Sequence, residues 1–297
     1  MVTGDLMPAF EPISLEKQDE YLERLAGSGI AASDYSFVNL WAWAQEYGLA
    51  WAWEDDLVWI RQSRPEHGYW APVGPWEEIR WEEALSGLGE AGPVFSRVPQ
   101  ELVALWEKRF PGRLEIDDSR DHWDYVYSVE DLVKLSGNRY HRKKNLLNQF
   151  RKRYAYEYFD IRGDMVRRVE AMKDRWCEWR DCESVELLAA ENRAIERLLE
   201  AWNRLRNIMG GALFVEGRGA AFCLAEQMAH QTVVIHAEKG FPEFAGAYQA
   251  INQMFLSAHR EFTWVNRQQD LGEEGLRRAK LSYHPVDLIR KHRVRFL

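Results

Sequence analysis

Polar and charged side chains gather at the ends of two predicted strands in a strand–helix–strand unit at residues 232–268. Glu238 and Lys239 follow the first strand, and Asn266 and Arg267 end the second. Such a unit is right-handed, and its ligand crevice lies at the carboxyl ends of its strands. A carboxylate there could accept a proton from an attacking amine, while Lys239 or Arg267 could hold an anion. The alternative is an ordinary salt bridge between strand ends.

Three more residues continue this polar set toward the C-terminus, namely Asp270, Lys280 and Tyr283. A phenol can protonate a leaving group, so Tyr283 is a candidate general acid. Asn266, Asp270 and Tyr283 therefore join Glu238 as catalytic candidates, and Lys280 joins Lys239 and Arg267 as a candidate for substrate binding. The alternative for Tyr283 is a packed tyrosine whose hydroxyl has a partner within the protein.

A basic helix is predicted over residues 139–153, which carry seven Lys or Arg and no acidic residue. A positive helix face with aromatic neighbours suits the phosphates of a tRNA, a nucleotide or an anionic lipid. Arg142, Lys143 and Lys144 are the candidates for this contact. The alternative is a solvated basic face that pairs with the acidic N-terminal half.

Composition excludes several classes of protein. The chain has no run of about 18 apolar residues, so no membrane span is expected. It has no basic segment followed by an apolar stretch at its start, so no signal peptide is expected. The three cysteines stand at no metal-ligand spacing and are interpreted as free thiols in a reducing compartment. We therefore expect a cytoplasmic protein without a metal site.

Charge and tryptophan are distributed unevenly along the 297 residues. The first 100 residues carry a net charge of −11 and eight of the 14 tryptophans, whereas the whole chain carries −8. This asymmetry predicts two domains, an acidic and Trp-rich one at 1–120 and a mildly basic one at 121–297. Packing in a core or at a domain surface is the favoured interpretation of the tryptophans over a ligand cage.

The second half has the clearer pattern. It predicts strands at 124–128 and 156–161, two helices at 163–181 and 186–208, and a meander of strands at 212–216, 220–227 and 232–238. A helix at 242–259, a strand at 262–267, a helix near 272–281 and a final strand near 288–296 complete it. The apolar run within 232–238 is typical of a central strand buried on both faces. This order predicts an α+β fold with a mixed sheet.

Several segments resemble the DUF2156 family, which is related to the C-terminal domain of phosphatidylglycerol lysyltransferases and, more distantly, to Fem-type peptidyltransferases. In chain order they are SFVNLW (36–41), AF (221–222) with Glu226, VIHAEK (234–239), GAYQAIN (246–252), VNRQQDLG (265–272) and GLRRAKLSYHP (275–285). The resemblance covers the whole chain and implies two tandem GNAT-like domains. Its matching segments add Glu226 to the catalytic candidates, and Tyr248 and Asn252 to the substrate- or donor-binding candidates.

In GNAT-like folds, two central parallel strands separate at their carboxyl ends, where backbone amides can hold an acyl carbonyl and stabilise its oxyanion. This sequence departs from the pattern twice. The segment 239–247 lacks the Gly-rich turn of acetyl-CoA sites, and Pro242 and Glu243 disfavour a pyrophosphate there. Gln268 stands where the family carries Glu, and Gln cannot act as a base, which leaves open whether the protein is catalytic.

Two functions remain. The first is an acyl- or aminoacyltransferase that moves its group from an activated carrier to an amine or hydroxyl of a small-molecule or lipid acceptor. The missing pyrophosphate turn and the basic helix favour aminoacyl-tRNA over acyl-CoA as its donor. The alternative is a non-catalytic GNAT-like module that binds RNA, a nucleotide or a protein partner.

Overall fold

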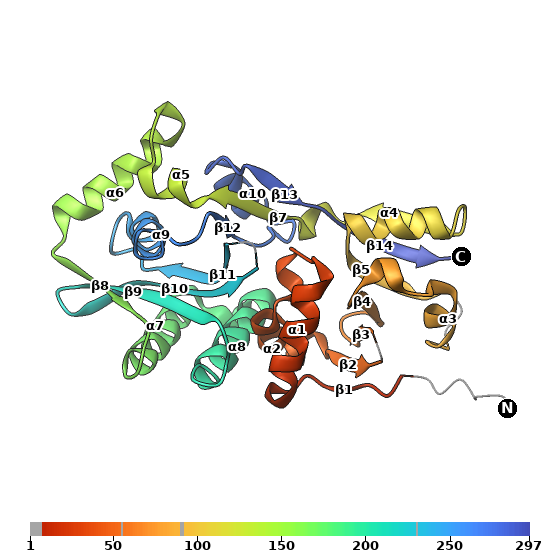
Figure 1. The fold of residues 1–297 in the computed structure, drawn as a ribbon. Helices are drawn as coiled ribbons and strands as arrows, with labels where there is room; N and C mark the ends of the chain where they lie inside the picture. The colour runs from red at the N-terminus through yellow and green to blue at the C-terminus, as the bar shows by residue number, and fades with distance from the viewer. Residues whose placement is uncertain (1–7, 55, 90–91, 230) are drawn as a thin grey trace. The chain divides into compact units, whose positions relative to one another are not determined.

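The computed structural model describes residues 8–54, 56–89, 92–229 and 231–297 (Figure 1). The chain forms two compact units. The N-terminal unit comprises the residues up to Trp123 together with Ile289–Leu297, and the C-terminal unit comprises Asp124–Leu288. The expected domains, 1–120 and 121–297, differ from these units chiefly in where the last strand belongs.

The N-terminal unit is built on a seven-stranded mixed sheet. In spatial order its strands are β1 (Glu11–Pro12), β2 (Ala50–Trp53), β3 (Val58–Gln62), β4 (Gly68–Val73), β5 (Val94–Pro99), β14 (Lys291–Phe296) and β6 (Leu114–Asp118). Its helices are α1 (Gln18–Ser28), α2 (Phe37–Tyr47), α3 (Trp81–Ser86) and α4 (Gln100–Arg109). Ser36 caps α2 by accepting a hydrogen bond from the Asn39 amide, and Gly48 ends the helix at φ 56°.

Half of the ten tryptophans of this unit belong to its buried core. The fully buried ones are Trp51, Trp59, Trp70, Trp81 and Trp106. Trp81 and Trp106 pack edge to face with centroids 5.2 Å apart, and Trp106 packs in the same way on Phe296 of the last strand. Core packing, rather than a ligand cage, therefore accounts for the Trp-rich composition of this half.

A buried charge cluster fixes the last strand in the N-terminal unit. Lys291 and Asp34, both almost fully buried, form an ion pair, and Arg97 Nε lies 2.9 Å from Asp34 Oδ1. Burial opposes ionisation of Asp34, but the charges of Lys291 and Arg97 hold its pKa below the ordinary value. The sequence places the final strand in the second domain, and this is wrong, because β14 pairs with β5 and β6.

Tyr35 closes the gap between the two parallel strands of the N-terminal sheet. β4 and β5 pair at Tyr69–Phe95 and Trp70–Ser96. One residue further on, the Tyr35 hydroxyl donates to the Arg97 carbonyl at 2.9 Å and accepts from the Ala71 amide at 3.0 Å. A buried phenol thus takes the backbone groups that the separating strands would leave unpaired.

The C-terminal unit is also built on a seven-stranded mixed sheet. Its strands are, in spatial order, β13 (Asp287–Ile289), β7 (Asp124–Ser128), β12 (Trp264–Asn266), β11 (Thr232–Gly240), β10 (Arg218–Met228), β9 (Ile208–Val215) and β8 (Tyr156–Asp160). Its helices are α5 (Val129–Lys134), α6 (His141–Arg153), α7 (Met165–Arg180), α8 (Glu186–Glu200), α9 (Ala247–Ala258) and α10 (Glu274–Leu281). Helices α5, α6 and α9 cover one face of the sheet, and α7 and α8 cover the other (Figure 1).

Two local expectations for this unit need correction. The predicted helix 186–208 ends at Glu200, and β9 begins at Ile208. Gly210 lies within β9, where a Cβ would stand 2.6 Å from the Cys223 carbonyl oxygen of the neighbouring strand. Cys177 and Cys182, expected to be free thiols, form a disulfide with Cα atoms 5.1 Å apart.

Within the described parts of the chain, no helix combines the length and the apolar character that crossing a bilayer requires.

We predict that Lys291→Met lowers the free energy of unfolding by about 3–5 kcal/mol, because it leaves Asp34 buried with half of its charge compensation removed. Urea denaturation of the full chain measures this change. The matched control is Arg295→Met on the same strand, whose partner Glu115 is half-exposed. That control should change stability by less than about 1 kcal/mol. Equal effects of the two variants would contradict the assigned role of the buried cluster.

Candidate active site

The central parallel strands of the C-terminal unit separate after three residue pairs. β11 and β12 pair from Thr232–Trp264 to Val234–Asn266, after which β11 continues alone on this side to Gly240. Beyond β12 the chain turns away at Gln268, whose φ is 55°, an uncommon conformation for a residue other than glycine. The carboxyl ends of the two strands are therefore unpaired with each other, at the place where the strand–helix–strand unit predicts a ligand site.

Glu238 spans this separation. Its Oε1 accepts a hydrogen bond from Arg267 Nη2 at 3.0 Å, and its Oε2 accepts one from Asn252 Nδ2 of α9 at 3.0 Å. The Glu238 side chain is 9% exposed and that of Arg267 is 15% exposed. The structure therefore brings together three of the predicted residues, one from each strand end and one from the helix that connects the strands.

Two tyrosines surround the guanidinium of Arg267. Its Cζ lies 4.9 Å from the ring centroid of Tyr283 and 5.8 Å from that of Tyr127. Its Nη1 is buried and has no hydrogen-bond partner among the described residues. Burial raises the pKa of Tyr283, so its phenol stays protonated, and its hydroxyl has the Gln249 side chain as a hydrogen-bond partner within the protein.

A second polar centre lies beside the first and includes a histidine that the sequence did not single out. His236 Nε2 is 3.2 Å from Glu226 Oε2, and His236 Nδ1 is 3.1 Å from Gln268 Nε2. His236 lies at an irregularity in the pairing of β10 with β11, where Ala225 opposes Ile235 and Leu224 opposes Ala237. His236 is the extra residue of this bulge, and its ring lies between Glu226 and Gln268.

Asp270 and Lys280 hold the loop after β12 instead of facing the crevice. Lys280 Nζ donates to the carbonyls of Arg267, Gln268 and Gln269 at 2.5, 3.1 and 2.6 Å. Burial lowers the pKa of Lys280 to about 7, while these three acceptors favour its ammonium form. This clamp fixes the backbone on which Arg267 and Gln268 stand.

Asp270 has its own partners. It accepts from the Tyr125 hydroxyl at 2.5 Å and from Arg277 Nε and Nη2 at 2.9 and 2.8 Å. Burial alone would raise its pKa, but these hydrogen bonds lower it to about 2. Asn266 is equally enclosed, since it donates to Asp124 and accepts from the Gln268 amide. Both predicted catalytic residues thus have contacts typical of positioning groups.

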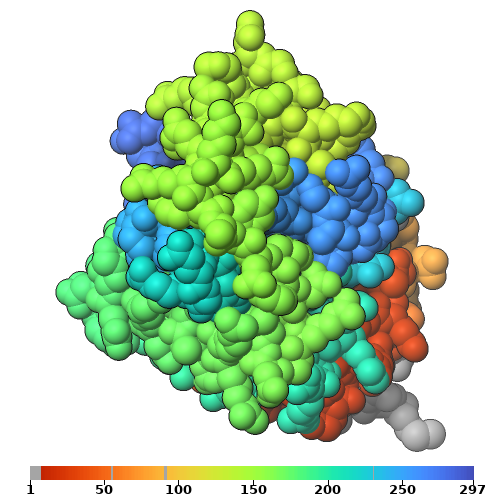
Figure 2. All heavy atoms as spheres, turned by 90° about the vertical axis from the view of Figure 1, so that its left-hand side faces the viewer, coloured from red at the N-terminus to blue at the C-terminus, as the bar shows by residue number. Residues whose placement is uncertain are grey.

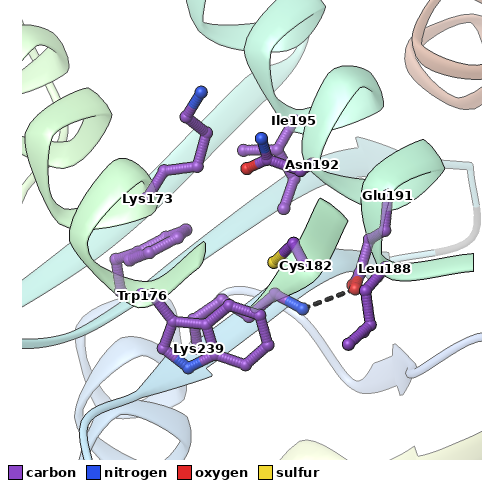
Figure 3. A pocket seen from close by; sticks show the side chains of 9 residues that line it. Lys173, Trp176, Cys182, Leu188, Glu191, Asn192, Ile195 and Lys239 are labelled. Carbon is purple, nitrogen blue, oxygen red and sulfur yellow. Dashed lines mark hydrogen bonds and ion pairs between the residues drawn. The ribbon is translucent and has the colours of Figure 1, made fainter. Parts of the chain in front are cut away.

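Lys239 points away from Glu238. Its Nζ lies 2.6 Å from Glu191 Oε2 and 4.1 Å from the ring centroid of Trp176, on the side of α7 and α8 (Figure 3). The cavity at this place has a volume of about 10 Å³, close to the minimum for one water molecule. Tyr248 is 39% exposed and lies against Gly240 at the end of β11. The structure does not bring Lys239 into the Glu238 centre.

The basic helix α6 divides its cations between two directions. Lys143 turns inward, and its Nζ lies 4.3 Å from the centroid of Tyr283. Arg142 and Lys144 are exposed, and Figure 2 shows the outer surface of α6, in yellow-green, on the face turned to the viewer. Lys143 therefore joins the Arg267 centre, whereas its two neighbours belong to the surface.

The segment before α9 is closed by the protein itself. The Tyr154 hydroxyl accepts a hydrogen bond from the Ala245 amide at 3.2 Å, and the Phe244 amide donates to the Phe241 carbonyl. Gly246 has φ 88°, and a Cβ there would stand 2.5 Å from the Leu146 carbonyl oxygen of α6. Helix α6 thus covers the turn at which α9 begins.

Residues 27–295 match the family described as phosphatidylglycerol lysyltransferase, C-terminal. The chain belongs to this family. The predicted resemblance to the phosphatidylglycerol lysyltransferase C-terminal domain is thereby confirmed. This family is a family of transferases.

Several solved structures resemble this chain over nearly its whole length. A conserved protein of unknown function from Bacteroides thetaiotaomicron is 30% identical, with a TM-score of 0.89 over 98% of this chain and 100% of that chain. L-PGS from Bacillus licheniformis is 13% identical, with a TM-score of 0.67 over 97% and 93%. An uncharacterized protein of Mycoplasmoides gallisepticum is 23% identical over 180 residues, and the match spans 59% of this chain and only 56% of that relative.

The fold class is confirmed as well. FemX gives a TM-score of 0.59 at 9% identity, covering 97% of both chains. A tandem GNAT protein from the clavulanic acid biosynthesis pathway gives 0.50 at 9% identity, covering 96% of this chain and 97% of that one. Together with the two mixed sheets, these likenesses show the tandem GNAT-like α+β fold in this phosphatidylglycerol lysyltransferase-family chain.

We predict that Lys280→Met loosens the loop after β12, because three carbonyls lose their shared donor. Amide hydrogen exchange of residues 267–272 should accelerate, and the free energy of unfolding should fall by about 2 kcal/mol. The control is Lys134→Met, which removes an exposed lysine paired with Glu130. Unchanged exchange at 267–272 in Lys280→Met would show that the loop holds its shape without the clamp.

Proposed function

We propose that the C-terminal unit transfers an aminoacyl group from an aminoacyl-tRNA to a hydroxyl or amine of a small-molecule or lipid acceptor. The observation that carries this proposal is Glu238, which bridges the separated ends of β11 and β12 through Arg267 and Asn252. It is a carboxylate on a rigid strand, next to a cation, at the edge where this fold class binds its ligands. Membership of a lysyltransferase family supports the same group transfer.

The reaction needs one proton acceptor and one proton donor. Glu238, whose carboxylate also accepts a hydrogen bond from Arg267, accepts the proton of the acceptor's hydroxyl or amine. The nucleophile then forms a bond to the carbonyl carbon of the aminoacyl ester, and the bond to the ribose oxygen breaks. Tyr283 protonates that oxygen and recovers its proton from Glu238 through solvent. The products are the aminoacylated acceptor and deacylated tRNA.

The closed turn before α9 supports tRNA over acyl-CoA as the donor. A pyrophosphate needs free backbone amides at this turn, but Ala245 and Phe244 already donate to Tyr154 and Phe241. The exposed basic residues of α6, by contrast, suit a polyanion outside the crevice. An aminoacyl-tRNA donor also places the reaction in the cytoplasm.

The reactive centre belongs to the C-terminal unit because the N-terminal unit has closed its own strand gap. Tyr35 accepts a hydrogen bond from the Ala71 amide, the donor that a substrate carbonyl would otherwise approach, and donates one to the Arg97 carbonyl. The N-terminal unit therefore contributes a Trp-rich structural core, and the chemistry is assigned to Glu238 and its neighbours.

We predict that Glu238→Gln lowers the rate of transfer by about 10²- to 10⁴-fold, because the amide cannot accept the proton. The assay follows a radiolabelled amino acid from charged bulk tRNA into a tRNA-free product in the presence of a bacterial lipid and small-molecule extract. Glu157→Gln, an exposed change on strand β8 of the same sheet, should retain the full rate. Equal rates for Glu238→Gln and the unaltered protein would remove Glu238 from the mechanism.

We also predict that the triple variant Arg142→Glu, Lys144→Glu and Lys152→Glu weakens tRNA binding by at least about tenfold and flattens its salt dependence. Filter binding at 50–200 mM salt measures both quantities. Reversal of the exposed Arg278 on α10 serves as the control. If Arg278→Glu weakens binding as strongly, α6 is not the RNA-binding surface.

A further inference from the structure

We propose that Cys177 and Cys182 are a site of reversible redox modification, at which a disulfide holds the turn between α7 and α8 closed over the side chain of Lys239. The bond joins the last turn of α7 to the residue that begins the short 3₁₀ helix after it, five positions further along the chain. This inference goes beyond the proposed transfer reaction and does not depend on it.

The disulfide is a local bond and not a staple between distant parts of the fold. A disulfide constrains the unfolded chain most when it closes a long loop, and this one closes only residues 177–182. The backbone hydrogen bonds of the turn are equally local, since the Ser184 amide donates to the Asp181 carbonyl and the Val185 amide donates to the Cys182 carbonyl. The bond therefore fixes one turn, and its loss leaves the rest of the fold in place.

Cys182 is the buried anchor of a segment that is otherwise exposed. It is 1% exposed, whereas each of the residues 183–187 is exposed to solvent. Figure 3 shows Cys182 among the side chains that line the small cavity beside Lys239, together with Trp176 and Glu191. A segment with few buried contacts opens at low cost. The bond to Cys177 restrains this opening.

The surroundings of the two sulfurs suit thiol exchange in one direction. The thiolate of a small-molecule thiol or of a protein dithiol attacks Sγ of Cys177, the more exposed cysteine of the pair, and Cys182 leaves as a thiolate. Two buried lysines, Lys173 and Lys239, line the same cavity as Cys182 and stabilise that negative charge. A second external thiol then releases Cys177. Both protein thiolates take up protons, and the two external thiols become a disulfide.

The cavity lies behind the strand end that carries Glu238. Lys239, the next residue, is 9% exposed in its side chain and places its Nζ 2.6 Å from Glu191 Oε2 and 4.1 Å from the ring centroid of Trp176. Opening of the turn takes Cys182 out of the wall of this cavity. Reduction of the disulfide therefore admits solvent and small reagents to the Lys239 ammonium.

The third cysteine provides a matched control. Cys223 is a free thiol, fully buried on β10, and its neighbour Phe222 lines the cavity. Because neighbouring side chains of a strand point to opposite faces of the sheet, Cys223 faces away from the pair and does not exchange with it. Cys223→Ala should preserve the whole redox response.

Equilibration of the full chain in glutathione buffers, followed by alkylation of free thiols and intact-mass measurement, tests the site. We expect the pair to pass from disulfide to dithiol and back across the range of glutathione ratios found in a cytosol. On reduction, amide exchange of residues 183–187 should accelerate by about fivefold or more, and acylation of Lys239 by about threefold or more. Acylation of the exposed Lys134 should not change.

Serine variants separate the bond from other effects of the reductant. Cys177→Ser and Cys182→Ser should each show fast exchange at residues 183–187 and a reactive Lys239 at every glutathione ratio, because neither can form the bond. Matching thermal melting curves of the two variants and the reduced protein show that the rest of the fold is intact.

Four outcomes would overturn the inference. Three free thiols in the fully oxidised protein would show that the pair does not form, and a disulfide that persists at the most reducing ratio would show a permanent bond. Equal amide exchange at residues 183–187 in the two redox forms, or equal acylation of Lys239, would show that the bond does not hold the turn closed. None of these measurements needs tRNA or turnover, so the failure of this inference and the failure of the transfer reaction are separately visible.

Discussion

The constraint on which the site depends is the early separation of two parallel strands. After three residue pairs β11 and β12 part, and each strand end must find partners for its polar groups without the other. In this unit charged side chains fill that requirement. Glu238 from one strand contacts Arg267 from the other, and Lys280 holds the three carbonyls that follow. The proposed proton acceptor, Glu238, thus also connects the two separated strand ends.

The N-terminal unit meets the same constraint in the opposite way. Its parallel strands β4 and β5 also separate, but Tyr35 supplies a neutral hydroxyl to both, and the buried carboxylate of Asp34 pairs with both Arg97 and Lys291 in the interior. The charged groups of this cluster are thus engaged with one another. The two units share an architecture, and they differ in whether a neutral phenol or a charged pair lies between the separating strands.

The sequence predicted the parts of the site that follow from strand order. Glu238 and Arg267 could be placed together because the carboxyl ends of parallel strands meet at one edge. His236 could not, because it is the extra residue of a bulge whose position the sequence does not mark. The direction of Lys280 and Asp270 depends on the tertiary path of the loop after β12, which spacing does not encode. β14 could not be assigned either, since its partner Asp34 is 257 positions away.

Helical periodicity, however, does contain a signal for the lysine of α6 that lies next to Tyr283. Lys143, Leu147 and Phe150 stand at i, i+4 and i+7, which places one lysine on the apolar stripe of α6. Leu147 and Phe150 are buried, and Lys143 is the cation that turns inward with them. A lysine on a buried stripe loses hydration, and this loss costs free energy unless an anion compensates the charge. The helical period of a basic helix therefore distinguishes the cations on its exposed face from a cation on its buried face.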